Sequence, residues 1–170
     1  MVTISELFAS LVEREAAISR RILERVPEGR AEWKPHEKSM PLGYLATLVA
    51  TMPGWVAMMV GQDSLDLNPP GGGGYKPRAA NTAPERLAAH EEAVRGALDA
   101  LRGTSDAHLA TPWRLLVAGQ VVAEAPRGDM IADTMTHLAH HRGQLSVYLR
   151  LNGALVPSLY GPSADDRSFG

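Results

Sequence analysis

The sequence predicts an all-α protein, a four-helix bundle with a long crossover between its second and third helices. In four stretches apolar residues recur at intervals of three and four, which is the period of a helix with one buried side. The second and third stretches are separated by residues 61–81, far more than the roughly two to eight residues that join antiparallel neighbours. With 45% hydrophobic and 21% charged residues, we expect one domain over residues 1–170.

The first two helices are marked by their start and stop signals. Thr3 and Glu6 match a capping box, in which each side chain satisfies a free backbone N–H at the start of a helix. The apolar period then continues until Pro27. A second helix follows with Pro41 in its first turn, where a missing N–H is tolerated. The proline–glycine pair at 53–54 interrupts its pattern, so we expect a kink there and not two separate helices.

The crossover at residues 61–81 is rich in glycine and proline and is expected to be a flexible connection. Its four-glycine run at 71–74 lacks the glycine–lysine–serine/threonine ending of a phosphate-binding loop. The length suits a chain that must return along the bundle before it starts a helix parallel to the previous one. Thr82 and Glu85 repeat the capping signature, and this third helix ends at Gly103.

Residues 113–124 contain two short β-prone runs around an alanine–glycine turn, which can form a small hairpin. Asp129 is then expected to cap the fourth helix, residues 130–152, and Gly153 supplies the stop signal. The apolar stripes of the helices place three leucines in one core: Leu48, Leu138 and Leu145.

A histidine pair on the fourth helix is the main chemical feature of the sequence. His137 and His141 are four residues apart, so their rings lie on one face, about one turn from each other. Two imidazoles so placed can bind one metal ion, or each can simply satisfy a hydrogen bond at the edge of the core. Gly143, in the helix interior, indicates close approach of another backbone, and Gln144 lies on the face of His141.

Composition excludes several classes of function. The formal net charge of -2 and the lack of a lysine- or arginine-rich run argue against nucleic-acid binding. The sequence has no cysteine, so disulfides, cysteine nucleophiles and thiolate metal sites are excluded. No uncharged apolar run reaches the length of about 18 residues that marks a membrane span, and the N-terminus lacks a secretory pattern. We therefore expect a cytoplasmic protein with no membrane partner.

Three segments carry a resemblance to a known family. They are H-L-A-H-H-R-G-Q-L-S-V-Y-L-R-L-N from His137, V-P-S-L-Y-G-P-S-A-D-D from Val156, and H-E-K-S-M-P-L-G-Y-L-A-T-L-V-A-T-M-P-G-W from His36. Together they resemble the DinB/YfiT-like superfamily. The resemblance implies a bundle with up-down-down-up topology, often a homodimer, and a divalent metal such as nickel or zinc bound by three histidines. Characterised relatives include transferases that use low-molecular-weight thiols such as bacillithiol or mycothiol.

The sequence departs from the family pattern at one metal ligand. The resemblance implies one histidine from the second helix and two from the fourth, and His137 and His141 match the latter pair. Where relatives read L-A-T-H-V-A this chain reads L-A-T-L-V-A, so Leu48 stands at the first ligand position. His90 falls on the inward stripe of the third helix and is our candidate for the third donor, whereas His140 is offset from the face of the pair.

Two functions remain open. In the first, a metal bound by the pair and a substitute ligand lowers the pKa of a bound water or thiol, giving a metal-dependent transferase or hydrolase. Arg142 would then steady an anionic group of a small-molecule substrate, and Gln144 would orient a ligand. In the second, the site has lost its metal and the bundle serves as a small-molecule-binding or dimerisation module. Leu48 favours the second function, and the intact H-H-R-G-Q run favours the first.

Overall fold

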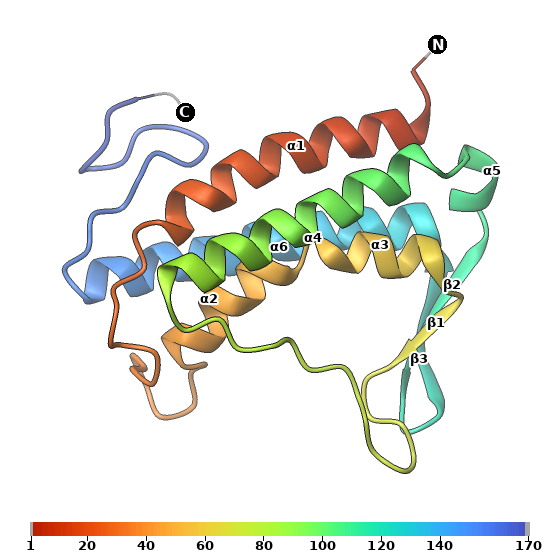
Figure 1. Ribbon diagram of the computed structural model, residues 1–170, viewed down its shortest axis with the longest axis horizontal. Coiled ribbons are helices and arrows are strands. Elements are labelled where there is room, and N and C mark those ends of the chain that lie inside the picture. Colours follow the sequence, from red (N-terminus) through yellow and green to blue (C-terminus); the bar gives the residue numbers. More distant parts are fainter. Residues whose placement is uncertain (1, 169–170) are drawn as a thin grey trace.

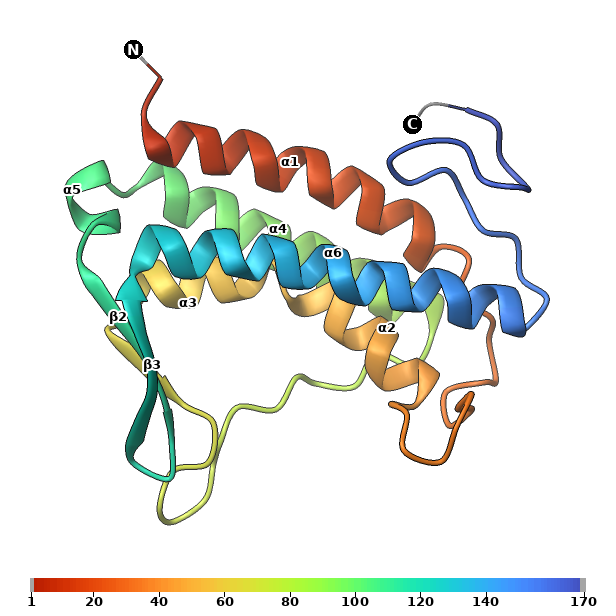
Figure 2. The same ribbon diagram turned by 180° about the vertical axis from the view of Figure 1, so that it is seen from behind.

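Four long helical runs form a bundle, and a small sheet extends from one of its ends (Figure 1). The computed structural model describes residues 2–168. The elements follow in this order: α1 (Ile4–Leu23), α2 (Leu42–Thr51), α3 (Gly54–Gly61), β1 (Ser64–Asp66), α4 (Ala83–Arg102), α5 (Asp106–Leu109), β2 (Pro112–Val117), β3 (Gln120–Pro126) and α6 (Arg127–Leu151). Helices α1 and α6 run in one direction along the bundle, whereas α2, α3 and α4 run in the other (Figures 1 and 2).

The prediction of an all-α four-helix bundle is wrong, because residues 2–168 contain six helices and a mixed three-stranded sheet. Strands β2 and β3 form the antiparallel hairpin that the β-prone runs suggested. Strand β1 pairs with β2 in parallel, with Leu65 opposite Leu115, and it lies in the crossover where we expected no strand. A strand of three residues is too short to show a period, so only its pairing with β2 defines it.

The second predicted helix is two helices, so the expectation of a single kinked helix is also wrong. The axes of α2 and α3 differ by 51°. Pro53 stands at the break and has no N–H to donate to the preceding turn, which ends the hydrogen bonding of α2. Gly54 then brings α3 against α4, since a Cβ added there would lie 3.6 Å from the Cβ of Ala93.

No single helix among residues 2–168 has the length and apolar character needed to cross a membrane; the bent pair α2–α3 meets those criteria only when its two helices are taken together.

The helix starts agree with the sequence in two cases out of four, and Pro41 is the N-cap of α2 instead of lying in its first turn. Both α1 and α4 begin with the predicted capping boxes, at Thr3 and Thr82. Helix α6 starts earlier than expected, at Arg127, directly after Pro126. Asp129 therefore does not cap the helix but lies in its first turn. Its negative charge there interacts favourably with the positive end of the helix dipole.

The core has two parts, one at each end of the bundle. Leu48, Leu138 and Leu145 are buried together in the first part, as predicted, with 7%, 1% and 0% of their surface exposed. The second part lies at the end that carries the sheet and includes Trp113 and Ile131. The cavity described below is lined by residues of the second part and by histidines of α6.

Candidate functional site

A cavity of about 600 Å³ lies where the sheet leaves the bundle. Its walls come from α3, from β1 and the crossover that follows it, from β2, and from the first half of α6. The lining is mostly apolar. Ligand-binding pockets usually have a volume of about 300–1,000 Å³ and an apolar lining with a few polar groups, so this cavity has the size and character of one.

The spacing of the lining residues follows from the elements that carry them. Trp55 and Met59 are four residues apart on α3 and therefore share one helical face. Trp113 and Leu115 are two residues apart on β2, so both point from the same side of the sheet. The pairing of Leu65 with Leu115 brings β1 into the same wall.

An aromatic pair connects the crossover to α3. The indole N–H of Trp55 donates to the hydroxyl of Tyr75 over 3.0 Å. The two ring centroids are 6.2 Å apart and the ring planes meet at 83°, which is an edge-to-face arrangement that aromatic pairs prefer. On its other side Trp55 lies 5.9 Å from the ring of His137. The cavity wall thus runs without a break from the crossover through α3 to the histidines of α6.

Three histidines of α6 lie together, as the sequence spacing indicated for two of them. The ring centroids of His137 and His141 are 4.4 Å apart, and that of His140 is 5.3 Å from His141. His137 and His140 line the cavity, whereas His141 is buried. Partial burial lowers the pKa of His137, and the neighbouring imidazoles of His141 and His140 lower it further. The neutral form of His137, which has a free nitrogen lone pair, is therefore favoured.

Gln144 fixes the proton of His141. Its side-chain oxygen Oε1 lies 2.8 Å from Nδ1 of His141. Because an amide oxygen only accepts hydrogen bonds, Nδ1 is the donor, and in the neutral tautomer with this hydrogen bond the lone pair lies on Nε2. Metal-binding histidines are commonly oriented through their second nitrogen in this way. The hypothesis that Gln144 orients a ligand stays a prediction; in the structure its side chain contacts His141.

The structure does not bring His90 to this pair. Its helix, α4, lies diagonally across the bundle from α6, because α1 and α3 each pack against both (Figures 1 and 2). The His90 ring is buried, with Nε2 3.0 Å from the carbonyl oxygen of Ala16 and Nδ1 3.3 Å from that of Ala50. Burial lowers the pKa of His90. The neutral ring that burial favours has one N–H, so it donates to one of these two carbonyl oxygens, of α1 or of α2, and His90 is packed between the helices and not turned toward α6.

Leu48 lies in the core cluster that also contains Leu138 and Leu145. On α6 these two leucines lie three residues before and four residues after His141, so all three side chains share one helical face. Leu48 of α2 thus belongs to the same core cluster as the two leucines of α6 that flank His141. That Leu48 stands at the first ligand position stays a prediction from the resemblance.

Arg142 is directed away from the cavity. It is fully buried against α1, where its guanidinium pairs with Glu15 and donates to the hydroxyl of Ser19 over 2.8 Å. It also contacts the hydroxyl of Tyr160 from the C-terminal segment. A guanidinium with these partners holds the bundle together and does not face a ligand in the cavity. Gly143 is exposed with no atom near its missing side chain, so the predicted close approach of another backbone is wrong.

Sequence reasoning missed the aromatic wall formed by Trp55, Tyr75 and Trp113. These residues belong to three segments that are distant in sequence, and only the folded chain brings them together. One signal was available for Trp113, since it alternates with Leu115 in a β-prone run and so had to share a face with it.

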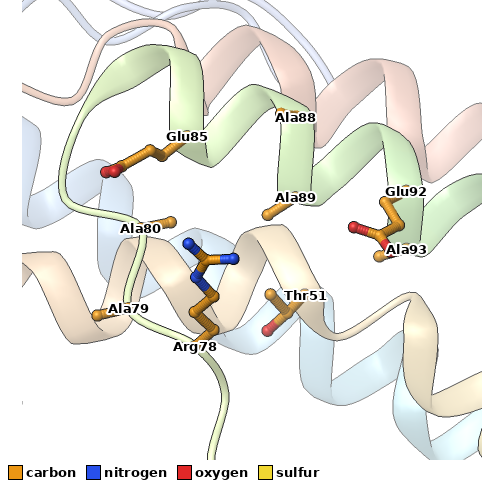
Figure 3. A pocket seen from close by; sticks show the side chains of 9 residues that line it. All are labelled: Thr51, Arg78, Ala79, Ala80, Glu85, Ala88, Ala89, Glu92 and Ala93. Carbon is orange, nitrogen blue, oxygen red and sulfur yellow. The ribbon is translucent and has the colours of Figure 1, made fainter.

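A second cavity, of about 380 Å³, lies between α4 and the crossover (Figure 3). Five alanines form much of its lining, and Arg78 extends from the crossover toward α4 (Figure 3). Glu85 is already engaged, because its carboxylate accepts the backbone N–H groups of Asn81 and Thr82 over 3.0 Å each. This cavity contains neither an aromatic side chain nor a histidine among its lining residues, so the α3–α6 cavity offers the richer chemistry.

Comparison with known proteins identifies the family. The model of the DinB superfamily matches residues 11–145 of this chain, which is most of its length. The chain belongs to the DinB superfamily. Among solved structures, a DinB-like protein from Bacillus cereus ATCC 10987 superposes with a TM-score of 0.69 at 19% identity, covering 94% of this chain and 99% of that one. The DinB-like protein YjoA from Bacillus subtilis gives 0.66 at 16% identity, covering 95% and 99%.

The sequence match to a curated relative is short. It is to the uncharacterized protein YrdA of Bacillus subtilis strain 168, 37% identical over 43 residues. The match covers 25% of this chain and about a quarter (26%) of that protein. At these low identities, the two solved structures show that the DinB fold is shared, and no function is assigned to this chain from them.

The DinB superfamily is generally associated with metal, so we asked whether the side chains of this member fit one. Among residues 2–168 no group of three or more His, Cys, Asp or Glu side chains is arranged to hold a metal ion. His137 and His141 offer two imidazole donors, and Leu48, which the resemblance assigned to the third ligand position, is a buried core residue. Catalytic metal sites normally keep three protein ligands, so the donor set is incomplete.

Proposed function

We propose that this DinB-family chain binds a small apolar molecule in the cavity between α3, α6 and the sheet. The observation that carries the proposal is the cavity itself, whose volume of about 600 Å³ and mostly apolar lining match those of ligand pockets. Its few polar groups are concentrated on α6, where Asp133, Thr136 and the histidines would set the orientation of the ligand. Burial of the apolar part of the ligand would supply most of the affinity.

A blocking substitution tests this proposal. Thr136 lines the cavity and is exposed, so Thr136→Trp is expected to fill the cavity without disturbing the core. The neutral probe N-phenyl-1-naphthylamine should bind the parent chain with increased fluorescence, and Thr136→Trp should weaken this binding by roughly tenfold or more, since the probe loses its buried contacts. Ala132→Trp is the matched control, because Ala132 is exposed one turn earlier on α6 and does not line the cavity.

Binding of the probe that is equal in the parent and in Thr136→Trp would show that the ligand site lies elsewhere. Circular dichroism of both tryptophan variants establishes that α6 is intact, which separates a filled cavity from a disturbed fold.

A second candidate function, metal-dependent catalysis, is favoured by one specific observation. Gln144 holds the proton of His141 on Nδ1, which leaves Nε2 free beside the neutral ring of His137. A nickel or zinc ion, when bound by this pair, would supply a Lewis acid and a nucleophilic water or thiol for a transferase or hydrolase. In that case Gln144 keeps His141 in the binding tautomer, and the apolar cavity keeps bulk water from the reacting groups.

Substitution of Leu48 tests this second candidate. Leu48 shares a core cluster with Leu138 and Leu145, which flank His141 on α6, so we expect Leu48→His to supply the missing imidazole. The affinity for zinc or nickel, measured by calorimetry, should rise roughly tenfold or more over that of the parent. Leu48→Gln is the matched control, since it adds a polar group of similar size without an imidazole. If Leu48→His folds and gains no affinity, position 48 does not face the pair and the metal-site hypothesis fails.

A further inference from the structure

The α3–α6 cavity is lined by one formally charged side chain, and that charge is negative. Asp133 lies one turn before His137 on α6, and no lysine or arginine lines this cavity. Among residues 2–168 the carboxylate of Asp133 takes part in no ion pair. A ligand that enters the cavity therefore meets one carboxylate and no lysine or arginine side chain from the lining.

The aromatic wall adds to this preference. Trp55, Tyr75 and Trp113 all line the cavity. The planes of Trp55 and Tyr75 meet at 83°, so they form two walls of a corner. The face of an aromatic ring carries partial negative charge and attracts a cation, most strongly for tryptophan. Proteins bind quaternary ammonium groups against several aromatic rings, and the lining of this cavity offers three.

We infer that the ligand of this cavity is a small apolar molecule that carries a positively charged ammonium group, and that anionic molecules are discriminated against. The inference rests on the proposed function, because it names the ligand class for the same cavity. The ammonium group would lie against the aromatic corner with Asp133 as its counter-charge, while the aliphatic side chains contact the rest of the molecule. An anion would face the Asp133 carboxylate and the negative ring faces with no cationic side chain from the lining to offset them.

Three probes of matched shape test the ligand class. Phenyltrimethylammonium, tert-butylbenzene and benzenesulfonate share a phenyl ring and a tetrahedral head group that is positive, neutral or negative. Their dissociation constants are measured directly on the full chain, at one ionic strength, from shifts of the tryptophan indole N–H signals in ¹⁵N-labelled protein. We expect phenyltrimethylammonium to bind roughly tenfold more tightly than tert-butylbenzene, and benzenesulfonate to bind most weakly.

A pair of carboxylate variants shows whether Asp133 is responsible. Asp133→Asn should reduce the advantage of the cation over tert-butylbenzene by roughly threefold, because it removes the counter-charge of the ammonium group. Asp129→Asn, which removes an exposed carboxylate on the same helix outside the cavity, should change neither affinity. Trp55→Leu should reduce the cation advantage further, because it removes the ring while keeping an apolar wall.

The outcomes separate this inference from the proposed function. If tert-butylbenzene binds as tightly as phenyltrimethylammonium, or benzenesulfonate binds best, the ammonium class is wrong, while cavity binding still stands on the naphthylamine result with Thr136→Trp. Equal effects of Asp133→Asn and Asp129→Asn on the cation would also overturn the role of Asp133. If none of the three probes shifts the indole signals of Trp55 or Trp113, the inference is wrong whatever the naphthylamine binds.

Discussion

Arg142→Met is expected to lower the free energy of unfolding by about 3–5 kcal/mol, because it leaves a buried carboxylate without its partner. The guanidinium of Arg142 is fully buried and pairs with the carboxylate of Glu15, of which 7% of the residue surface is exposed. It also donates to the backbone carbonyl oxygen of Glu15 over 3.0 Å and to Ser19 over 2.8 Å. Three groups of α1, the carboxylate and backbone carbonyl of Glu15 and the hydroxyl of Ser19, are thus bound by one side chain of α6.

Urea denaturation followed by circular dichroism measures the effect. The double variant Glu15→Leu with Arg142→Met should recover much of the lost stability, because replacing both charges with apolar groups removes the unpaired one. Arg150→Met is the control, since Arg150 forms an exposed ion pair with Asp165 at 2.7 Å and its loss should cost at most about 1 kcal/mol.

The same experiment decides between two roles for Arg142. If Arg142→Met folds with nearly the parent stability but loses affinity for an anionic ligand, the residue contacts ligand, as the sequence analysis suggested. Loss of stability with cavity binding retained in the folded fraction assigns it to the attachment of α1 to α6. The buried contacts with Glu15 and Ser19 lead us to expect the second result.

The sequence predicted those features that depend on short-range spacing. His137 and His141 lie together because residues four apart on a helix are neighbours whatever the rest of the fold. The capping boxes at Thr3 and Thr82 formed for the same reason, since all their bonds lie within one turn. The role of Arg142 could not be predicted in this way, because its partner Glu15 is 127 residues away in the chain.

The fold class failed for a related reason. Strand β1 has three residues, and it exists because β2 offers it a parallel partner. The aromatic cavity depends in turn on the sheet, since Trp113 reaches it from β2 and Tyr75 from the crossover. Periodicity within a segment contains no information about such pairings between distant segments, and so the part of the site that would contact a ligand was absent from the prediction.

If the cavity depends on where the sheet is docked, the residue that docks it should control both stability and binding. Arg127, at the start of α6, is buried and donates to the carbonyl oxygens of Met59 and Pro112 over 2.8 Å each. It also pairs with Asp63 and donates to the hydroxyl of Thr111. These partners belong to the end of α3, the start of β2 and the two connections that lead to the sheet.

Arg127→Met is therefore expected to lower the free energy of unfolding by about 3–5 kcal/mol, since several buried carbonyl oxygens lose their donor at once. It should also weaken the binding of N-phenyl-1-naphthylamine, because β2 carries the Trp113 wall of the cavity. Arg127→Lys keeps the charge but not the forked set of donors, so it should fall between the parent and Arg127→Met in both measurements.

Arg114→Met is the matched control on the same sheet. Arg114 pairs with Glu124 across β2 and β3 while 53% of its side chain is exposed, and its loss should cost at most about 1 kcal/mol and leave probe binding intact. Hydrogen exchange locates the effect, because the β1–β2 amides should exchange faster in Arg127→Lys than in Arg114→Met, while those of α1 and α4 change little. Equal exchange of the β1–β2 amides in the two variants would mean that the sheet is docked by its apolar face alone, and that Arg127 does not position the Trp113 side of the cavity.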